Sequence, residues 1–144
     1  MARPDPLDLA ARALRHRDRT RRQVEERLER AGVDDDARQG TLETLERIGY
    51  VDDRRYAHRR AQLLADRGYG DEAIRQFLEA EGVPGEALAE ALEELPAERE
   101  RADGLLAAAR DPRREAARLV RRGFAPETVA EAVERAFADG GAEA

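Results

Sequence analysis

The sequence predicts an all-α protein made of three tandem three-helix units in an elongated array that can curve. Apolar residues recur every three or four positions, as along residues 57–64, which is typical of amphipathic helices. Residues 28–32, 78–82 and 119–123 share a Leu-x3-Gly spacing, which we use as a marker, and an apolar pattern returns after each of these glycines. Charged residues make up 40% of the chain and aromatic residues 4%, so each helix can bury only a narrow stripe.

The marker glycines suggest where the units begin and end. We predict units at residues 5–49, 50–95 and 97–138, followed by a frayed tail at 139–144. Each marker glycine suits a left-handed residue that ends the second helix of its unit. The expected helices cover residues 7–17, a second helix from residue 20, then 34–48, 52–67, 71–81, 84–95, 97–110, a helix from 112, and 126–137.

Capping signals support these helix starts. Thr20 and Gln23 have the spacing of a capping box, and Asp52 is a good N-cap. Asp111 and Pro112 fit the N-cap and first positions of another helix. The apolar stripes predict a core made of Leu14, Val24, Leu28, Leu45, Tyr56, Leu64, Ile74, Leu78, Leu88, Leu92, Val129 and Val133.

The three units are not equally apolar. Glu115 stands in the third unit where Val24 and Ile74 stand in the other two, so the third core should be poorer. Arg38 likewise occupies the position of Leu88. A unit of about forty residues buries little surface alone, so we expect neighbouring units to pack on each other.

Composition excludes several kinds of chemistry. All 26 basic residues are arginine, and Lys, Cys, Ser and Asn are absent. This removes disulfides, thiolate metal ligands, Ser and Cys nucleophiles and the lysine of phosphate-binding loops. His16 and His58 lie outside any recognisable ligand motif, and the paired aspartates each begin a predicted helix. We therefore expect no enzyme activity, no metal site and no cofactor.

Net charge and hydropathy limit the kinds of partner and the cellular location that we expect. The formal net charge of −6 argues against a protein whose main task is to coat nucleic acid. No apolar run is long enough to span a membrane, and the first residues lack the core of a signal peptide. We expect a cytoplasmic monomer that does not bind membranes.

The arginines are unevenly distributed. Residues 1–31 carry nine Arg against six acidic residues, and residues 110–122 carry six Arg against two. Residues 76–103 carry nine acidic residues against two Arg. Because the guanidinium group pairs equally well with carboxylates and phosphates, a local basic face can bind a partner despite the net acidic charge. We predict that partner binding involves Arg19, Arg21, Arg22, Arg55, Arg59, Arg67 and Arg75.

Residues 49–83 carry a resemblance to a known family. Tyr50-Val51-Asp52-Asp53-Arg54-Arg55-Tyr56-Ala57, followed by Gly68-x-Gly70, Ile74, Leu78 and Gly82-Val83, resembles the middle of the RecX family of small bacterial regulators of the recombinase RecA. Upstream, Ala13-Leu14, Arg21 and Leu28-x3-Gly32 resemble the opening helices of that family. The resemblance covers residues 7–95 well and the remainder loosely.

The resemblance implies a function without catalysis. Members of the family are understood to bind in the groove of the RecA–DNA filament, where they limit strand exchange, ATP hydrolysis and co-protease activity. This would place the chain in recombination, DNA repair and the SOS response. The chain departs from the family at Gln62 and Leu64, where basic residues are typical, and at Phe77, where an acid is common.

Two other classes of function stay open. A three-helix unit also suits a helix-turn-helix DNA-binding protein, although the predicted third helices here are acidic rather than rich in Arg, Asn or Gln. A helical scaffold with an unknown protein partner is the other alternative. Weak contact with nucleic acid inside a filament is compatible with the first reading, a filament regulator.

Overall fold

The computed structural model describes residues 5–142, and within this range it contains nine α-helices and no strand. The helices are α1 (Pro6–His16), α2 (Arg21–Arg30), α3 (Asp35–Arg47), α4 (Asp53–Asp66), α5 (Asp71–Ala80), α6 (Gly85–Glu94), α7 (Glu98–Ala107), α8 (Pro112–Arg121) and α9 (Pro126–Ala142). The all-α prediction is therefore confirmed.

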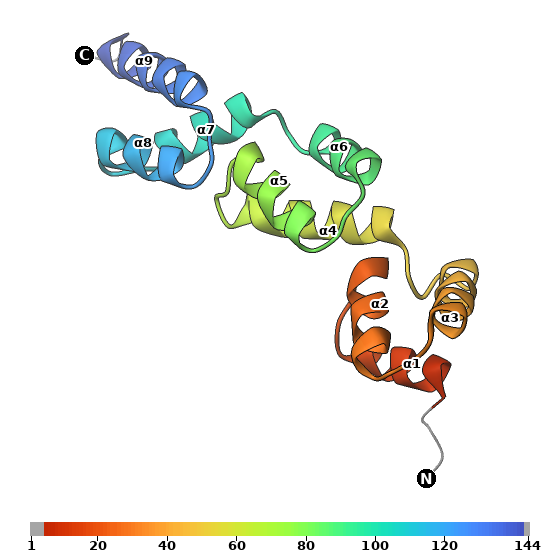
Figure 1. Ribbon diagram of the computed structural model, residues 1–144. Helices are drawn as coiled ribbons and strands as arrows, with labels where there is room; N and C mark the ends of the chain where they lie inside the picture. The colour runs from red at the N-terminus through yellow and green to blue at the C-terminus, as the bar shows by residue number, and fades with distance from the viewer. Residues whose placement is uncertain (1–4, 143–144) are drawn as a thin grey trace.

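The helices follow one another in three groups of three along an elongated molecule (Figure 1). Helices α1–α3 pack together, as do α4–α6 and α7–α9. The first and last groups lie at opposite ends, with α4–α6 between them. This arrangement matches the predicted elongated array. The unit boundaries themselves remain a prediction, which the grouping supports.

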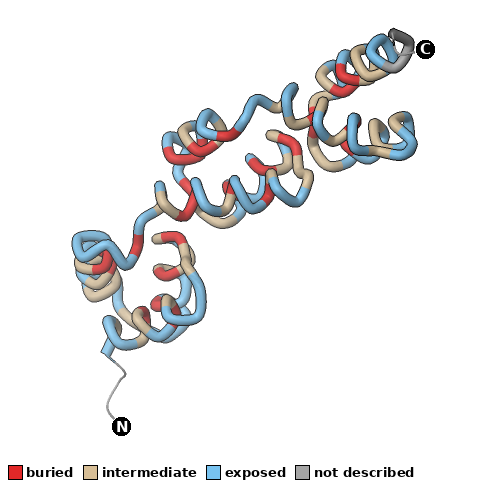
Figure 2. The backbone as a smooth tube through the Cα atoms, turned by 180° about the vertical axis from the view of Figure 1, so that it is seen from behind, coloured by how far each residue is buried: buried red, intermediate tan, exposed pale blue. Residues whose placement is uncertain are grey.

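Each group of helices has its own hydrophobic core (Figure 2). The three clusters of buried residues draw on separate helix groups, with Val51 just before α4 completing the first. Most of the predicted core residues are buried, but Leu14, Leu92 and Val133 are only partly buried. In a single row of three-helix groups no second layer covers the outer flanks, so residues at the edge of a stripe keep contact with solvent. Phe77 is 38% exposed for the same reason.

The three predicted caps are confirmed, and Asp34 caps a fourth helix in the same way. The Thr20 side chain accepts from the Gln23 backbone in a capping box, and the side chains of Asp34, Asp52 and Asp111 accept from N–H groups three residues on. Most helices begin or end within a residue or two of the predicted positions, but α7 ends earlier, at Ala107.

The predicted frayed tail at residues 139–144 stays a prediction. Helix α9 continues through Ala142, and residues 143–144 lie outside the described part of the chain. Gly140 and Gly141 lower the helix propensity by about 1 kcal/mol each but do not forbid the conformation. A helix already formed over residues 126–139 can propagate through them.

Neighbouring groups touch through the ends of their middle helices. Thr20 Oγ1, at the start of α2, donates to the backbone oxygen of Glu81 at the end of α5 over 2.6 Å. At the start of α5, the Gly70 N–H donates to the Arg122 oxygen over 2.8 Å, and Glu72 N–H donates to the Gly123 oxygen over 3.3 Å. Helices α8, α5 and α2 thus stack head to tail along the array (Figure 1). We call the α2–α5 contact the first joint and the α5–α8 contact the second joint.

The second joint requires glycine on both sides. A Cβ atom at Gly70 would lie 2.3 Å from the Phe124 nitrogen, and one at Gly123 would lie 2.5 Å from the Ala73 Cβ. Gly123 also has a φ of +92°, a left-handed conformation that side chains disfavour. The marker glycine therefore both ends a helix and lets the next group approach.

Candidate partner-binding surface

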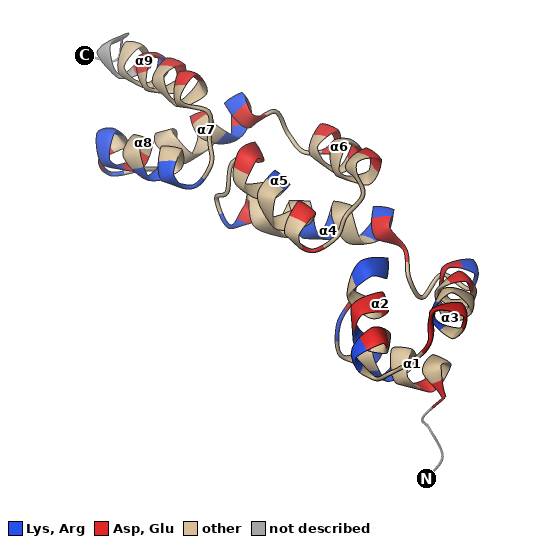
Figure 3. Cartoon of the chain, viewed as in Figure 1, with Lys and Arg blue, Asp and Glu red and all other residues tan. Residues whose placement is uncertain are grey.

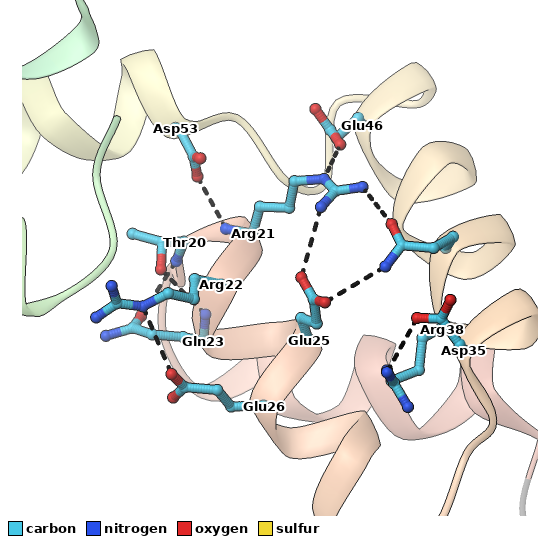
Figure 4. Close-up of polar contacts among 11 residues, drawn as sticks. Thr20, Arg21, Arg22, Gln23, Glu25, Glu26, Asp35, Arg38, Glu46 and Asp53 are labelled. Atoms are coloured by element: carbon cyan, nitrogen blue, oxygen red, sulfur yellow. Dashed lines mark hydrogen bonds and ion pairs between the residues drawn. The ribbon is translucent and has the colours of Figure 1, made fainter. Parts of the chain in front are cut away.

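Arg21, one of the predicted binding residues, is a hub of contacts among α2, α3 and α4, beside the first joint (Figure 4). Its guanidinium group contacts Glu46 over 2.5 Å, Gln39 over 2.9 Å and Glu25 over 3.5 Å. Its backbone N–H donates to Asp53 Oδ1 over 2.8 Å, which ties α2 to the start of α4. A side chain held by three groups of its own chain has little capacity left for a partner.

Arg22 also serves the first joint. Its Nη2 donates to the backbone oxygen of Ala80 over 2.6 Å, and its Nε lies 3.5 Å from Glu26. The oxygen belongs to the last turn of α5, where carbonyl groups have no partner inside the helix. Arg22 therefore caps α5 from the neighbouring group, and its side chain packs against Gly82, where an added Cβ would lie 2.7 Å from the Arg22 Cβ.

Arg55, on α4, also links the first and second groups. We call the boundary between these two groups the seam. Its Nη1 donates to the Gly49 oxygen over 2.8 Å, beyond the end of α3, and its Nη2 lies 3.5 Å from Asp18. Asp18 Oδ2 is buried without a hydrogen-bond partner among the described residues. The positions of Arg21, Arg22 and Arg55 favour a structural role, and their contact with a partner stays a prediction.

The other four predicted arginines make fewer contacts. Arg19 is half-buried and donates from Nε to the Ala13 oxygen over 3.1 Å. Burial lowers the pKa of Arg19, and the neighbouring Arg17, Arg27 and Arg30 lower it further. The remaining three are exposed: Arg75 pairs with Glu72 over 3.5 Å, whereas Arg59 and Arg67 form no side-chain ion pair in the described structure.

Arg59 lies in a groove across the seam between the first two groups. Two adjoining depressions of about 580 and 230 Å³ share Asp18 and Arg59. We call them together the arginine groove, lined by Ala11, Leu14, Arg15, Arg17, Asp18, Gly49, Tyr50, Arg55, Tyr56, Arg59, Arg60 and Leu63. Arg15, Arg17 and Arg59 are exposed and form no ion pair within residues 5–142.

The groove combines positive charge with exposed apolar surface. Tyr50 is 56% exposed and Leu63 is 41% exposed, so each offers a face to a partner. Arg15 and Arg17 were not among the predicted binding residues, because in the sequence they are two of many arginines near the start of the chain. The fold brings the loop after α1 beside α4, and no local spacing in the sequence signals this contact.

Two further arginines that the sequence did not single out hold the second joint. Arg122 donates from Nη2 to the Arg67 oxygen over 2.7 Å, and its guanidinium lies 4.1 Å from the centre of the Tyr69 ring. Arg101 contacts Asp71 over 2.8 Å and the Tyr69 oxygen over 3.1 Å. Arg122 also explains the exposed position of Arg67, whose backbone rather than side chain takes part in the joint.

A polar cluster of Tyr56, Arg60 and Glu81 adjoins the first joint. The Tyr56 hydroxyl donates to the Glu81 carboxylate, which also accepts from Arg60 Nε over 2.9 Å. Burial, with the hydrogen bond to Glu81, raises the pKa of Tyr56 to about 12. Burial also raises the pKa of Asp53, although the Arg21 N–H bond acts in the opposite direction. These carboxylates are engaged in structure rather than poised for proton transfer.

The described residues offer no group that suggests metal chemistry. No set of three or more His, Asp or Glu side chains converges to hold an ion within residues 5–142. His58 pairs with Glu94 on the surface, and His16 is exposed. Among the helices that the structure describes, none is both long and apolar enough to cross a bilayer.

Comparison with known proteins shows what the chain resembles. No protein-family model matches it. The regulatory protein RecX of Stenotrophomonas maltophilia (strain R551-3) is 30% identical over 88 residues, which make up 61% of this chain and 54% of that protein. The match therefore spans about half the length of the curated relative.

Solved structures share the fold over nearly the whole chain. The crystal structure of RecX from Lactobacillus salivarius superposes with a TM-score of 0.79 at 17% identity, covering 91% of this chain and 94% of the other. A second crystal structure, of regulatory protein RecX, superposes with a TM-score of 0.72 at 20% identity, covering 91% and 73%. Together the aligned residues and the shared fold confirm the resemblance predicted from the sequence: the chain is RecX-like in sequence and in fold.

Proposed function

We propose that this chain is a non-enzymatic, cytoplasmic regulator that binds the RecA–DNA filament and inhibits its recombinase and ATPase activities. The support is twofold: the curated relative is named a regulatory protein, and the chain shares the RecX fold. The proposal places it in recombination, DNA repair and the SOS response.

The observation that carries the proposal is the arginine groove on an elongated array. A row of three helix groups can lie along a protein filament and contact more than one subunit of it. Arg15, Arg17 and Arg59 have no acidic partner within the described chain, so they are available to carboxylates of a protein or phosphates of DNA. The exposed faces of Tyr50 and Leu63 add apolar contact, which protein interfaces use.

Helix-turn-helix binding to DNA is the weaker alternative. Acidic residues are concentrated on the third helices of the groups, most clearly on α6 (Figure 3). A recognition helix with this charge would be repelled by the phosphate backbone. Basic residues instead lie on α2, α4, α8 and the α1–α2 loop, and the start of α2 and the end of α8 are partly occupied by the two joints.

A comparison of three baits tests the proposal. We expect the protein to bind assembled RecA filaments on single-stranded DNA more strongly than free RecA or naked duplex, and to lower ATP turnover by the filament. Preference for naked duplex at physiological salt would instead support DNA binding. Failure to bind any bait would overturn the proposal and leave the scaffold reading.

Charge reversal in the groove tests the surface. Arg15→Glu with Arg59→Glu should weaken filament binding at least about tenfold, because two exposed, unpaired cations become anions. The matched control is Arg99→Glu, an exposed arginine on α7 outside the groove, which should bind like the wild type. Circular dichroism should show an unchanged fold for both variants. Unchanged binding by the double variant would exclude the groove.

A further inference from the structure

The head-to-tail stacking of middle helices leaves one joint open at each end of the array. The marker glycines Gly82 and Gly123 are covered by Arg22 and Ala73 of the preceding group. Their counterpart Gly32, at the end of α2, would have no atom within 4 Å of an added Cβ. The last turn of α2 therefore forms a free end of the molecule, opposite the end formed by α9 (Figure 1).

The free end at α2 is positively charged. Arg27 and Arg30 lie on its last turns, both exposed, and Arg17 and Arg19 lie close to them. Arg17, Arg27 and Arg30 form no ion pair within the described chain. Burial lowers the pKa of Arg19, and repulsion from these three arginines lowers it further. Glu29 is the one acidic residue on these turns that is not already paired with an arginine of α2.

The opposite end carries a row of acidic groups. Glu127, Glu131 and Glu134 are spaced i, i+4 and i+7, so they lie on one face of α9. All three are exposed and none forms an ion pair within residues 5–142. The arginine on this helix, Arg135, is occupied by Asp103 over 2.9 Å. Phe137, 51% exposed, adds an apolar contact next to the row.

We propose that the partner of the arginine cluster at the free end of α2 is a second copy of this chain, bound through the acidic face of its α9. Arg27 and Arg30, spaced i and i+3, face the i and i+4 spacing of Glu127 and Glu131 over nearly the same length of helix. Because the two surfaces lie at opposite ends of one chain, the contact is heterologous and extends into a row of copies.

This contact is weak between copies free in solution and strong between copies bound side by side on one filament. Exposed ion pairs contribute little individually and are screened by salt. Two copies held next to each other on one filament have a high effective concentration, so the same contact then acts within one assembly. The inference goes beyond filament binding and does not require it, since the two ends are complementary in the isolated protein.

Sedimentation velocity on the isolated full-length protein tests the contact. At about 10 mM salt, where the Debye length is about 30 Å, the weight-average sedimentation coefficient should rise with protein concentration, and the rise should vanish at about 0.5 M salt. A sedimentation coefficient that stays constant up to the highest attainable concentration at low salt would overturn the proposal. These experiments contain no RecA, so their failure leaves the proposed function untouched.

A charge swap identifies the surfaces. Arg27→Glu with Arg30→Glu makes both ends acidic, and Glu131→Arg with Glu134→Arg makes both ends basic; Glu127 is kept because it lies in the first turn of α9. Each variant alone should lose the concentration dependence, and an equimolar mixture should regain it. The control is Glu93→Arg, an exposed and unpaired acid on α6, which should associate like the wild type. A mixture that stays monomeric, or a control that loses association, would contradict the assigned surfaces.

Discussion

The two joints both connect neighbouring helix groups, but they use different chemical groups to do so. At the first joint, the hydroxyl of Thr20 and the guanidinium of Arg22 reach the carbonyl groups at the end of α5. At the second joint, backbone N–H groups of Gly70 and Glu72 reach the carbonyl groups at the end of α8. The helix-end bonds of the first joint therefore run from side chains to backbone, whereas the second joint adds direct backbone–backbone bonds to the side-chain bonds of Arg122 and Arg101.

This difference predicts how each joint tolerates change. A long side chain such as that of Arg22 can adjust its rotamers when its surroundings move, whereas two backbones in contact have no such freedom. The second joint should therefore be the more rigid and the more sensitive to added atoms. The first joint should permit more relative motion of the groups on either side, and the arginine groove lies across that seam.

The largest expected effect is at the second joint. Gly123→Ala should destabilise the protein by about 2–5 kcal/mol, because it adds a clash with Ala73 to the strain of a left-handed residue. Gly32→Ala is the matched control, since its φ of +81° is similar but the space around it is open. Urea unfolding should show only the strain of about 1–2 kcal/mol for the control. Equal losses would mean that the joint contributes no packing constraint.

Gly82 gives the same substitution at the first joint. Gly82→Ala should fall between the other two, because its Cβ would meet the Cβ, Cδ and Nε atoms of Arg22, of which the outer two can shift, whereas that of Gly123 would meet the backbone of Ala73 as well as its Cβ. The ranking Gly123, then Gly82, then Gly32 in the loss of unfolding free energy would sharpen the contrast between a backbone joint and a side-chain joint. A larger loss at Gly82 than at Gly123 would reverse the comparison.

The arginines of the joints should differ more modestly. Arg122→Ala removes two bonds to carbonyl groups and the stacking on Tyr69, a loss of about 2 kcal/mol. Arg22→Ala removes one bond to the Ala80 oxygen and should cost about 1 kcal/mol. Thermal unfolding of both variants in one buffer would compare them. A greater loss for Arg22→Ala would show that the first joint depends on its arginine more than the second does.

The smallest expected loss of stability concerns Tyr56 in the polar cluster next to the first joint, and it depends on pH. Tyr56→Phe should cost about 1 kcal/mol at neutral pH, because Arg60 still pairs with Glu81. The folded pKa of Tyr56 is raised from 10.0 to about 12, so between these values the unfolded chain releases this proton and the folded chain keeps it. The free energy of unfolding then falls as the pH rises through this window.

Comparison with the variant isolates that pH dependence. Tyr56→Phe lacks the ionisable group, so its stability should fall less steeply than that of the wild type between about pH 10 and about pH 12. Urea midpoints measured across this range would give the two slopes. Parallel slopes would show that the hydroxyl is not held in its protonated form by the folded structure.

The sequence predicts what depends on local spacing. The helices, their caps at Thr20, Asp52 and Asp111, and the left-handed marker glycines all follow from patterns within one turn or two of the chain. The end of α9 was the exception, because glycines late in a helix weaken it without setting its last residue. The partly buried Leu14 also shows that a stripe predicts a facing direction and not the depth of burial.

The candidate binding surface was harder to predict, because the sequence does not show which arginines contact a neighbouring helix group and which remain exposed. Arg21, Arg22 and Arg55 look as available in the sequence as Arg59, and only the fold shows that they hold neighbouring elements together. Arg15, on the last turn of α1, and Arg17, just after that helix, join the groove because the end of α1 lies beside α4. A signal was present in the repeat: Thr20 and Gly70 each lie twelve residues before the marker glycine of their unit, Gly32 and Gly82.

The separation of the three cores has a consequence for how such a chain can lengthen. Each joint bonds the first turn of one middle helix to the last turn of the next, with a few arginine contacts beside it, and no buried cluster crosses it. A duplicated segment that carries its own core and its own marker glycine would find both of its contact surfaces already present in its neighbours. The architecture is thus able to grow or shrink by whole modules, with the interior of every existing module left unchanged.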